Sequence, residues 1–228
     1  MISFKIFPKN IIAAVSEKND GAMKDSSANR RAFFSKLGLE EKRVVSGHLV
    51  HGNNITVVSA KDRGKKIKRT DGLITANKNI LLSVTIADCL PILLYDPIMN
   101  IIGIVHAGWR GLEKEIPKAA LEKFAELGSK PSDILAAIGP GIGQCHFEVQ
   151  KDVADKFSIY PETILKPDRK IFIDLKAIAE IQLLGQGLRE KNIEINPDCT
   201  FDYPDKYFSF RRDKPETIQA MTAVIGMS

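Results

Sequence analysis

The sequence predicts a mixed α/β fold of the α+β class, and three observations support this prediction. Short runs rich in Val, Ile and Leu have strand length and are bounded by Gly, Pro, Asn and Asp. Two longer segments repeat apolar residues at the three- to four-residue spacing of helices. The strand patterns outnumber the helical ones, so we expect packed sheets that are covered by a few helices.

Four runs predict strands. They are NNITVVSA at 53–60, ILLSVTI at 80–86, PILLYDP at 91–97 and NIIGIVHAG at 100–108. Their β-branched composition and their flanking turn residues favour strands that are mostly buried.

Two segments predict helices. In the first, apolar residues from Leu112 to Leu127 repeat at helical spacing, and charged residues fill the opposite side. This helix should cover a sheet. The second helix should begin after Asp174, which is a good N-cap residue, and end near Asn192.

Length and composition fit one domain that comprises residues 1–228. With 44% hydrophobic and 27% charged residues, the chain can bury one substantial core. The N-terminal residues show no leader pattern, and no apolar run approaches the roughly 20 residues of a membrane span. Three cysteines are too few for a disulfide framework. We therefore expect a soluble protein of the reducing cytoplasm.

The formal net charge of +5 is modest, and basic residues cluster only at 61–69, in KDRGKKIKR. Such a cluster is usually a solvated loop. Nucleic-acid binding is the alternative, but the sequence has no zinc-finger spacing, RNP-like stretch or helix-turn-helix pattern. We expect neither nucleic acid nor a membrane as the partner.

The first candidate site residues lie in HLVHGNN at 48–54, where Gly52 and two Asn residues allow the chain to turn. If 48–51 is extended, His48 and His51 point to opposite faces, because side chains alternate along a strand. Only one of the two histidines would then face a shared site.

The second group is Asp88 and Cys89, which stand between two apolar strand-like runs. A thiol at a turn on a sheet edge is placed for access rather than for packing. An isolated free cysteine is more commonly a small buried hydrophobe, and on these residues alone that interpretation of Cys89 stays open.

The third group lies in IVHAGWRGL, where a strand ends in His106 and a helix starts after Trp109 and Arg110. A helix start offers N–H groups and a positive dipole end to a phosphate. Arg110 would reinforce such a site, although an Arg at this position is more often paired with a local carboxylate. Trp109 could stack on a flat base or be an ordinary core aromatic.

Together, these motifs resemble one family. HGNNITVV, DGLIT, TIADCLPILLYDP, IVHAGWRG, IGPGIGQCHFEV and YFSFRRD occur here in the order seen in the laccase-domain polyphenol oxidoreductase family, which includes purine nucleoside phosphorylases. The resemblance covers roughly residues 40–213. It implies packed mixed sheets with outer helices in α/β/β/α layers, similar to the cytotoxic necrotizing factor catalytic domain.

The resemblance also implies a metal ion, zinc or alternatively copper, that is held by His51, Cys89 and His106. Two imidazoles and one thiolate leave a tetrahedral position open, where zinc lowers the pKa of bound water to about 7. A multicopper relay needs many more histidines than the four in this chain. The expectation is therefore a single metal centre.

Members of the family are associated with phosphorolysis of adenosine, inosine and methylthioadenosine and with deamination of adenosine, so purine nucleosides and phosphate are the implied small-molecule partners. Deamination needs a carboxylate that moves protons, for which Asp88 and Glu148 are both candidates. Phosphorolysis needs phosphate held beneath the ribose, for which Arg110, Arg211 and Arg43 are candidates. The sequence leaves the oligomeric state open.

Two departures from the family pattern concern the site. Members commonly have Gln where this chain has Leu49, so a hydrogen-bonding side chain is missing close to His51. Members also tend to follow the RRD motif with Gly and Arg, whereas this chain continues KPETIQAM at 214–221. An expected cationic contact is therefore missing, and activity or substrate choice should differ.

Cys145 and Cys199 are two further candidate site residues. Cys145 and His146 are candidate ligands or a nucleophilic pair, but adjacent residues on a strand diverge, which favours a packing role. No motif near Cys199 indicates a second metal ligand or a catalytic partner, so we expect Cys199 to have a packing role as well.

Rival functions remain open. Cys89 as nucleophile with His51 or His106 as its base would make a cysteine hydrolase of the amidase or deamidase type. A polyphenol oxidoreductase is another alternative. A third is a non-catalytic binding protein that uses the basic residues Lys65–Arg69.

Overall fold

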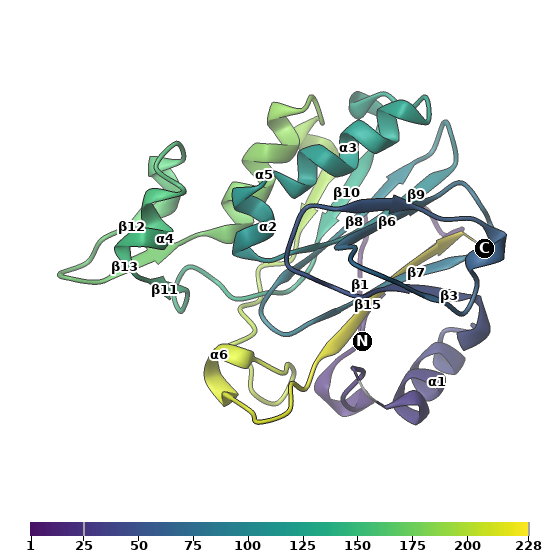
Figure 1. The fold of residues 1–228 in the computed structure, drawn as a ribbon, viewed down its shortest axis with the longest axis horizontal. Coiled ribbons are helices and arrows are strands. Elements are labelled where there is room, and N and C mark those ends of the chain that lie inside the picture. Colours follow the sequence, from purple (N-terminus) through teal and green to yellow (C-terminus); the bar gives the residue numbers. More distant parts are fainter. Residues whose placement is uncertain (25, 228) are drawn as a thin grey trace.

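Two six-stranded sheets share a core at the centre of the protein, in a computed structural model that describes residues 1–24 and 26–227 (Figure 1). The first sheet has the order β1 (Ile2–Ser3), β2 (Ile11–Val15), β15 (Met221–Met227), β7 (Leu81–Ile86), β3 (Val44–Gly47), β5 (Lys66–Ile67). The second has the order β14 (Ile193–Ile195), β10 (Leu135–Ile138), β8 (Leu90–Asp96), β9 (Ile101–Ala107), β6 (Gly72–Thr75), β4 (Ile55–Val57).

Both large sheets are mixed. For example, β3 pairs with β7 in parallel, whereas β15 pairs with β7 antiparallel. A third, small sheet has the order β11 (Glu148–Val149), β13 (Ile171–Ile173), β12 (Ile164–Leu165) and projects to one side in Figure 1. The predicted α+β class with mixed sheets is confirmed.

The α-helices lie outside the sheets. They are α1 (Ser27–Lys36), α2 (Trp109–Glu113), α3 (Ile116–Glu126), α4 (Lys151–Asp155), α5 (Leu175–Gly185) and α6 (Phe210–Asp213). Short 3-10 helices span Lys18–Asp20, Glu41–Arg43, Ala60–Asp62, Pro131–Asp133, Pro161–Thr163 and Glu190–Asn192. None of the helices in the described part of the chain is long and apolar enough to span a membrane.

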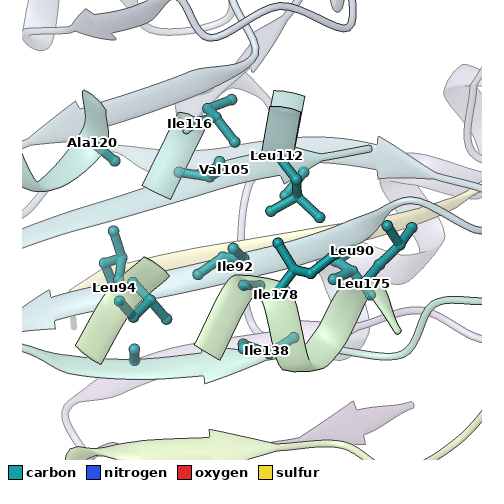
Figure 2. Packing of buried hydrophobic residues seen from close by; sticks show 14 of the residues in the cluster. Leu90, Ile92, Leu94, Val105, Leu112, Ile116, Ala120, Ile138, Leu175 and Ile178 are labelled. Atoms are coloured by element: carbon teal, nitrogen blue, oxygen red, sulfur yellow. The ribbon is translucent and has the colours of Figure 1, made fainter. Parts of the chain in front are cut away.

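The alternation of side chains along β8 shows how the layers pack. Leu90, Ile92 and Leu94 face the helices α2, α3 and α5, as Figure 2 shows. Leu93 and Tyr95, on the other face, pack in the core between the two sheets. A strand that is buried on both faces is a continuous apolar run, which is why the sequence predicted it.

The same alternation on β9 positions a site residue. Ile102 and Ile104 point into the core between the sheets, and His106 continues that face at the end of the strand. On the outer side of the first sheet, Phe33 and Phe34 of α1 are buried against Leu81 and other residues of that sheet. The layers therefore follow the order helix, sheet, sheet, helix.

Both helix predictions need correction. The segment 112–127 forms two helices, because Glu115 adopts a left-handed conformation with φ of 53° between α2 and α3. Asp174 caps α5 as predicted, and its carboxylate accepts the N–H groups of Lys176 and Ala177. However, α5 ends at Gly185 rather than near Asn192, since the chain turns at Gly187, where φ is 94°.

The strand predictions are most accurate for the buried strands. The runs at 80–86, 91–97 and 100–108 form the buried strands β7, β8 and β9. The run at 53–60 forms only the short β4 at the edge of its sheet, and β4 is not fully buried. Most residues of the basic cluster at 61–69 are exposed, in agreement with a solvated segment.

Candidate metal centre and substrate pocket

Three segments that are far apart in the sequence bring the expected ligands together. His51 follows β3, Cys89 lies between β7 and β8, and His106 lies near the end of β9. The ligand atoms of these three side chains all lie within 4.8 Å of one another. The two imidazole rings meet edge to face, with their centroids 4.9 Å apart.

The segment before His51 is not a continuous strand. β3 ends at Gly47, and His51 itself has a φ of 57°. The alternation expected for 48–51 therefore does not apply, and both His48 and His51 line the same pocket.

Asp71, which was not among the predicted site residues, supports the centre. Its fully buried carboxylate accepts the backbone N–H groups of His51 and Gly52, each at 2.8 Å. One oxygen of the same carboxylate lies 3.2 Å from Nδ1 of His106. This contact orients the ring and leaves Nε2 of His106 available as a ligand, as second-sphere carboxylates do in metal sites.

Asp88 holds the turn beside Cys89. Its carboxylate accepts the hydroxyl of Thr200 at 2.6 Å and the backbone N–H of Arg211 at 2.7 Å. Asp88 also has a φ of 84°, a left-handed conformation that is uncommon outside glycine. Its two hydrogen bonds therefore stabilise a strained turn that presents the thiol.

The electrostatics of the three residues favour a thiolate. Burial raises the pKa of Cys89, but the charge and hydrogen bonds of His106 and the contact with His51 outweigh burial and lower the pKa to about 6. Burial also opposes a charged His106, whereas Cys89 and Asp71 raise its pKa to about 9. Without a metal, the two groups form a thiolate and imidazolium pair at neutral pH, and a thiolate is the form of cysteine that binds metals.

The donor set fits a single metal ion. One sulfur and two imidazole nitrogens match the three-ligand pattern of catalytic zinc sites, in which a fourth position stays open. Gly108 leaves the thiol accessible, because a Cβ atom at this position would lie 2.8 Å from Sγ of Cys89. With four histidines in the whole chain, the residues do not fit a multicopper relay.

A cavity of about 750 Å³ opens onto the three ligands. Its size is in the range that binds small molecules. Four of the predicted site residues line it in addition to the ligands: Asp88, Trp109, Arg110 and Arg211. The cavity wall formed by the first sheet includes the hydroxyl groups of Ser83, Thr85 and Thr222.

The two predicted arginines that line the cavity are positioned differently. The guanidinium of Arg110 stacks on the ring of Trp109 at 4.2 Å, and among the described residues it forms no ion pair. Arg211 is anchored by Nη1, which donates to the backbone oxygen of Glu148 at 2.8 Å, and it lies over the ring of Phe147. Arg110 therefore has free donors for an anion.

Two predicted residues lie outside the cavity. The carboxylate of Glu148 pairs with Lys170 at 3.4 Å on the surface, because β11 directs it away from the ligands. Arg43 donates to the backbone oxygens of Lys78 and Asn79 instead of pointing to the pocket. The structure does not bring either side chain to the metal centre.

Other lining residues were not predicted. Arg30 of α1 lies at the cavity, and its guanidinium pairs with Glu41 at 3.0 Å. Lys24 and Lys66 also line the cavity, and Lys66 belongs to the basic cluster at 61–69. No helical pattern was apparent at 27–36, so nothing pointed to Arg30, whereas the position of Asp71 in DGLIT marked it as a possible site residue.

Cys145 and His146 do not diverge as expected. They lie in a turn rather than a strand, since the N–H of His146 donates to the backbone oxygen of Gly143. Nδ1 of His146 therefore approaches Sγ of Cys145 to 3.3 Å. Cys145 is exposed, so the packing role expected for it is wrong, whereas Cys199 is buried.

Fold and site define a layered α+β protein with one His₂Cys metal-type centre at the end of a small-molecule cavity. The chain belongs to the family described as multi-copper polyphenol oxidoreductase laccase, whose sequence profile matches residues 14–228.

Similar proteins carry a different name. The chain is 30% identical to the purine nucleoside phosphorylase YlmD of Bacillus subtilis, over 96% of this chain and 89% of that protein. It is 34% identical to a purine nucleoside phosphorylase of Deinococcus radiodurans, over 87% of this chain and 76% of that protein. The crystal structure of YlmD from Geobacillus stearothermophilus superimposes with a TM-score of 0.90 at 29% identity, covering 96% and 92% of the two chains.

Proposed function

We propose that this protein is a metal-dependent purine nucleoside phosphorylase, with adenosine, inosine and methylthioadenosine as substrates. The observation that carries the proposal is the cavity of about 750 Å³ that joins the His51, Cys89 and His106 cluster to Arg110. Relatives named purine nucleoside phosphorylase, which align with most of the chain, support the substrate class.

The reaction needs phosphate beside the ribose. In phosphorolysis, an oxygen of phosphate forms a bond to the anomeric carbon while the bond from that carbon to the purine nitrogen breaks, and the purine leaves with a proton. A guanidinium binds phosphate through two parallel donors. Arg110 is the primary phosphate ligand in this proposal, and Arg211 shapes the cavity wall next to it.

The metal site would hold zinc in preference to copper, and copper remains the alternative. A bound zinc ion supplies a Lewis acid that stabilises negative charge or activates water. In this chain, Asp71 fixes the orientation of His106 and the turn that carries His51, and the Cys89 thiolate is available at neutral pH. Trp109 offers an aromatic surface to the purine at the cavity wall.

Deamination of adenosine is a second proposed activity of the same pocket. It requires a carboxylate that transfers protons near the purine. Asp88 lines the cavity, whereas Glu148 lies outside it, so Asp88 is the group assigned to this role. Hydrogen bonds from Thr200 and Arg211 keep its carboxylate in place.

Chromatography of adenosine incubated with purified protein tests the proposal. Adenine that forms only with added phosphate identifies phosphorolysis, and inosine identifies deamination. Both products should disappear in the Cys89→Ala variant. If metal-loaded wild-type protein forms neither adenine nor inosine, adenosine is not its substrate and the proposal is wrong.

A cysteine hydrolase is the rival function, because a thiolate beside an imidazolium is also the arrangement of a cysteine nucleophile. A nucleophile that works without metal should be indifferent to chelators. Loss of adenosine cleavage on chelation, with recovery on adding zinc, would favour the phosphorylase. Hydrolysis of amide substrates that persists in chelator would favour the hydrolase.

A further inference from the structure

A second cluster of ligand-type side chains lies outside the pocket. We infer a second binding site for a zinc-type cation, formed by Cys145, His146, Cys199 and Asp202. Their ligand atoms all lie within 4.8 Å of one another, as in the first cluster. None of the four lines the substrate cavity, so the site is separate from the proposed catalytic centre.

Two loops build this site. In the first loop, the N–H groups of His146 and Phe147 both donate to the backbone oxygen of Gly143, and the resulting turn places Cys145 and His146 side by side. In the second loop, Cys199 forms an isolated parallel bridge with Gly141. Backbone pairing thus fixes the separation of the two loops without any metal.

The distances suit a tetrahedral ion. Nδ1 of His146 lies 3.3 Å from Sγ of Cys145, 3.9 Å from Sγ of Cys199 and 3.1 Å from a carboxylate oxygen of Asp202. Sγ of Cys145 lies 3.4 Å from the other oxygen of Asp202. Zinc bonds of about 2.3 Å to sulfur and about 2.0 Å to nitrogen or oxygen place tetrahedral ligands roughly 3.3–3.8 Å apart.

Neighbouring groups orient the ligands. The backbone N–H of Gly143 donates to Sγ of Cys199 at 3.1 Å, which stabilises a thiolate. The ring of His146 stacks on Phe201 with 4.0 Å between centroids and 12° between planes. A Cβ atom at position 143 would lie 3.1 Å from Sγ of Cys145, so glycine keeps the space between the cysteines open.

The donor types select the cation. Two thiolates, one imidazole and one carboxylate suit zinc and not magnesium or calcium, which prefer oxygen ligands. Four protein ligands leave no open position, which is the pattern of a structural site. The ion would join two loops that border the pocket, since Thr200, next to Cys199, bonds to Asp88 and Arg211 contacts the backbone oxygen of His146.

Zinc stoichiometry under reducing conditions tests the inference without any activity assay. Wild-type protein should bind two equivalents, as measured by competition with a chromophoric chelator. Cys89→Ala, which disables the first centre, should still bind one equivalent. Adding Cys145→Ser and Cys199→Ser to this variant should abolish zinc binding, and zinc should no longer raise the melting temperature.

Because Cys199 is buried, Cys199→Ser could lower zinc binding by misfolding the protein. Two single variants at less buried positions avoid this problem. In the Cys89→Ala protein, His146→Gln and Cys145→Ser change partly or fully exposed side chains and should each weaken zinc binding at least tenfold. The matched control Asp205→Asn changes a nearby exposed carboxylate outside the cluster and should bind zinc normally. Zinc binding that is unchanged by His146→Gln and Cys145→Ser, or a Cys89→Ala protein that binds no zinc, would overturn the inference.

Discussion

Asp71 shows how one buried carboxylate organises the metal centre. It binds the turn that carries His51 through backbone N–H groups and contacts the ring of His106 directly. Because both histidines depend on it, the position of a metal ion held by them would depend on a residue that does not contact the ion. Its pKa is low despite burial, because His106 and these N–H groups stabilise the charged form.

We predict that Asp71→Asn weakens zinc binding at the first centre about 10- to 100-fold, the usual effect of losing a second-sphere partner. Asp96→Asn is the matched control. Asp96 is also a buried carboxylate that accepts backbone N–H groups, but in the turn at Ile98 and Met99, away from the ligands. Competition titration with a chelator measures both affinities, and equal losses in the two variants would contradict the assigned role.

The reactivity of the Cys89 thiol should depend on pH. In chelator-treated protein, iodoacetamide should alkylate Cys89 with a midpoint near pH 6, since the thiolate reacts and its pKa is about 6. Alkylation is therefore slow below pH 6 and fast above it, and bound zinc should suppress it. Cys145 is an internal control, because burial, Cys199 and Asp202 raise its pKa to about 12. Peptide mapping by mass spectrometry gives both rates, and a midpoint near the ordinary 8.5 would refute the assignment.

Arg110 is the residue assigned to phosphate. Arg110→Ala should raise the KM for phosphate about tenfold or more, because a hydrogen bond to a charged group contributes about 1.5–3 kcal/mol. Arg43→Ala should leave this KM unchanged, since Arg43 lies outside the cavity. Steady-state rates at varied phosphate distinguish the two, and a larger effect of Arg43→Ala would reverse the assignment.

At the scale of elements, short turns carry the site while long strands carry the core. His51, Cys89 and the start of α2 all follow strands of the two large sheets. The helices contribute mainly apolar faces, and Leu112, Ile116 and Ile178 pack on β8 and β9 (Figure 2). The stability of these helices therefore depends mainly on burial of their apolar faces, and caps add to it.

The N-cap residue of α5, Asp174, should contribute to the stability of the protein. Asp174→Ala should lower the free energy of unfolding by about 1 kcal/mol, because the N–H groups of Lys176 and Ala177 lose their acceptor. Asp155→Ala is the control, since its exposed ion pair with Lys151 contributes at most about 0.5 kcal/mol. Urea denaturation measures both, and equal effects would contradict the capping role.

At the scale of the whole molecule, the sequence predicted what is local or buried. Continuous apolar runs identified β7, β8 and β9, and Asp174 identified the start of α5. β15 was missed, although it lies at the centre of the first sheet, because its small residues and Gly226 resemble no strong strand pattern. The predictions of one domain for 1–228 and of a cytoplasmic location stay predictions.

The site was predictable only in part. Residues 51, 89 and 106 are far apart in the sequence, and family resemblance rather than spacing grouped them. The contact of Asp71 with His106 arises from the pairing of β6 with β9, which no local pattern encodes. The turn at 143–147 was read as a strand, so the proximity of Cys145 and His146 was missed.

Phosphorolysis of a purine nucleoside by this protein should require a metal ion held by His51, Cys89 and His106. The most direct measurement is phosphate-dependent release of adenine from adenosine by chelator-treated protein during titration with zinc. We predict no release before zinc is added, a rise as zinc binds, and no recovery in Cys89→Ala. Release at full rate by the metal-free protein, or by Cys89→Ala, would contradict it.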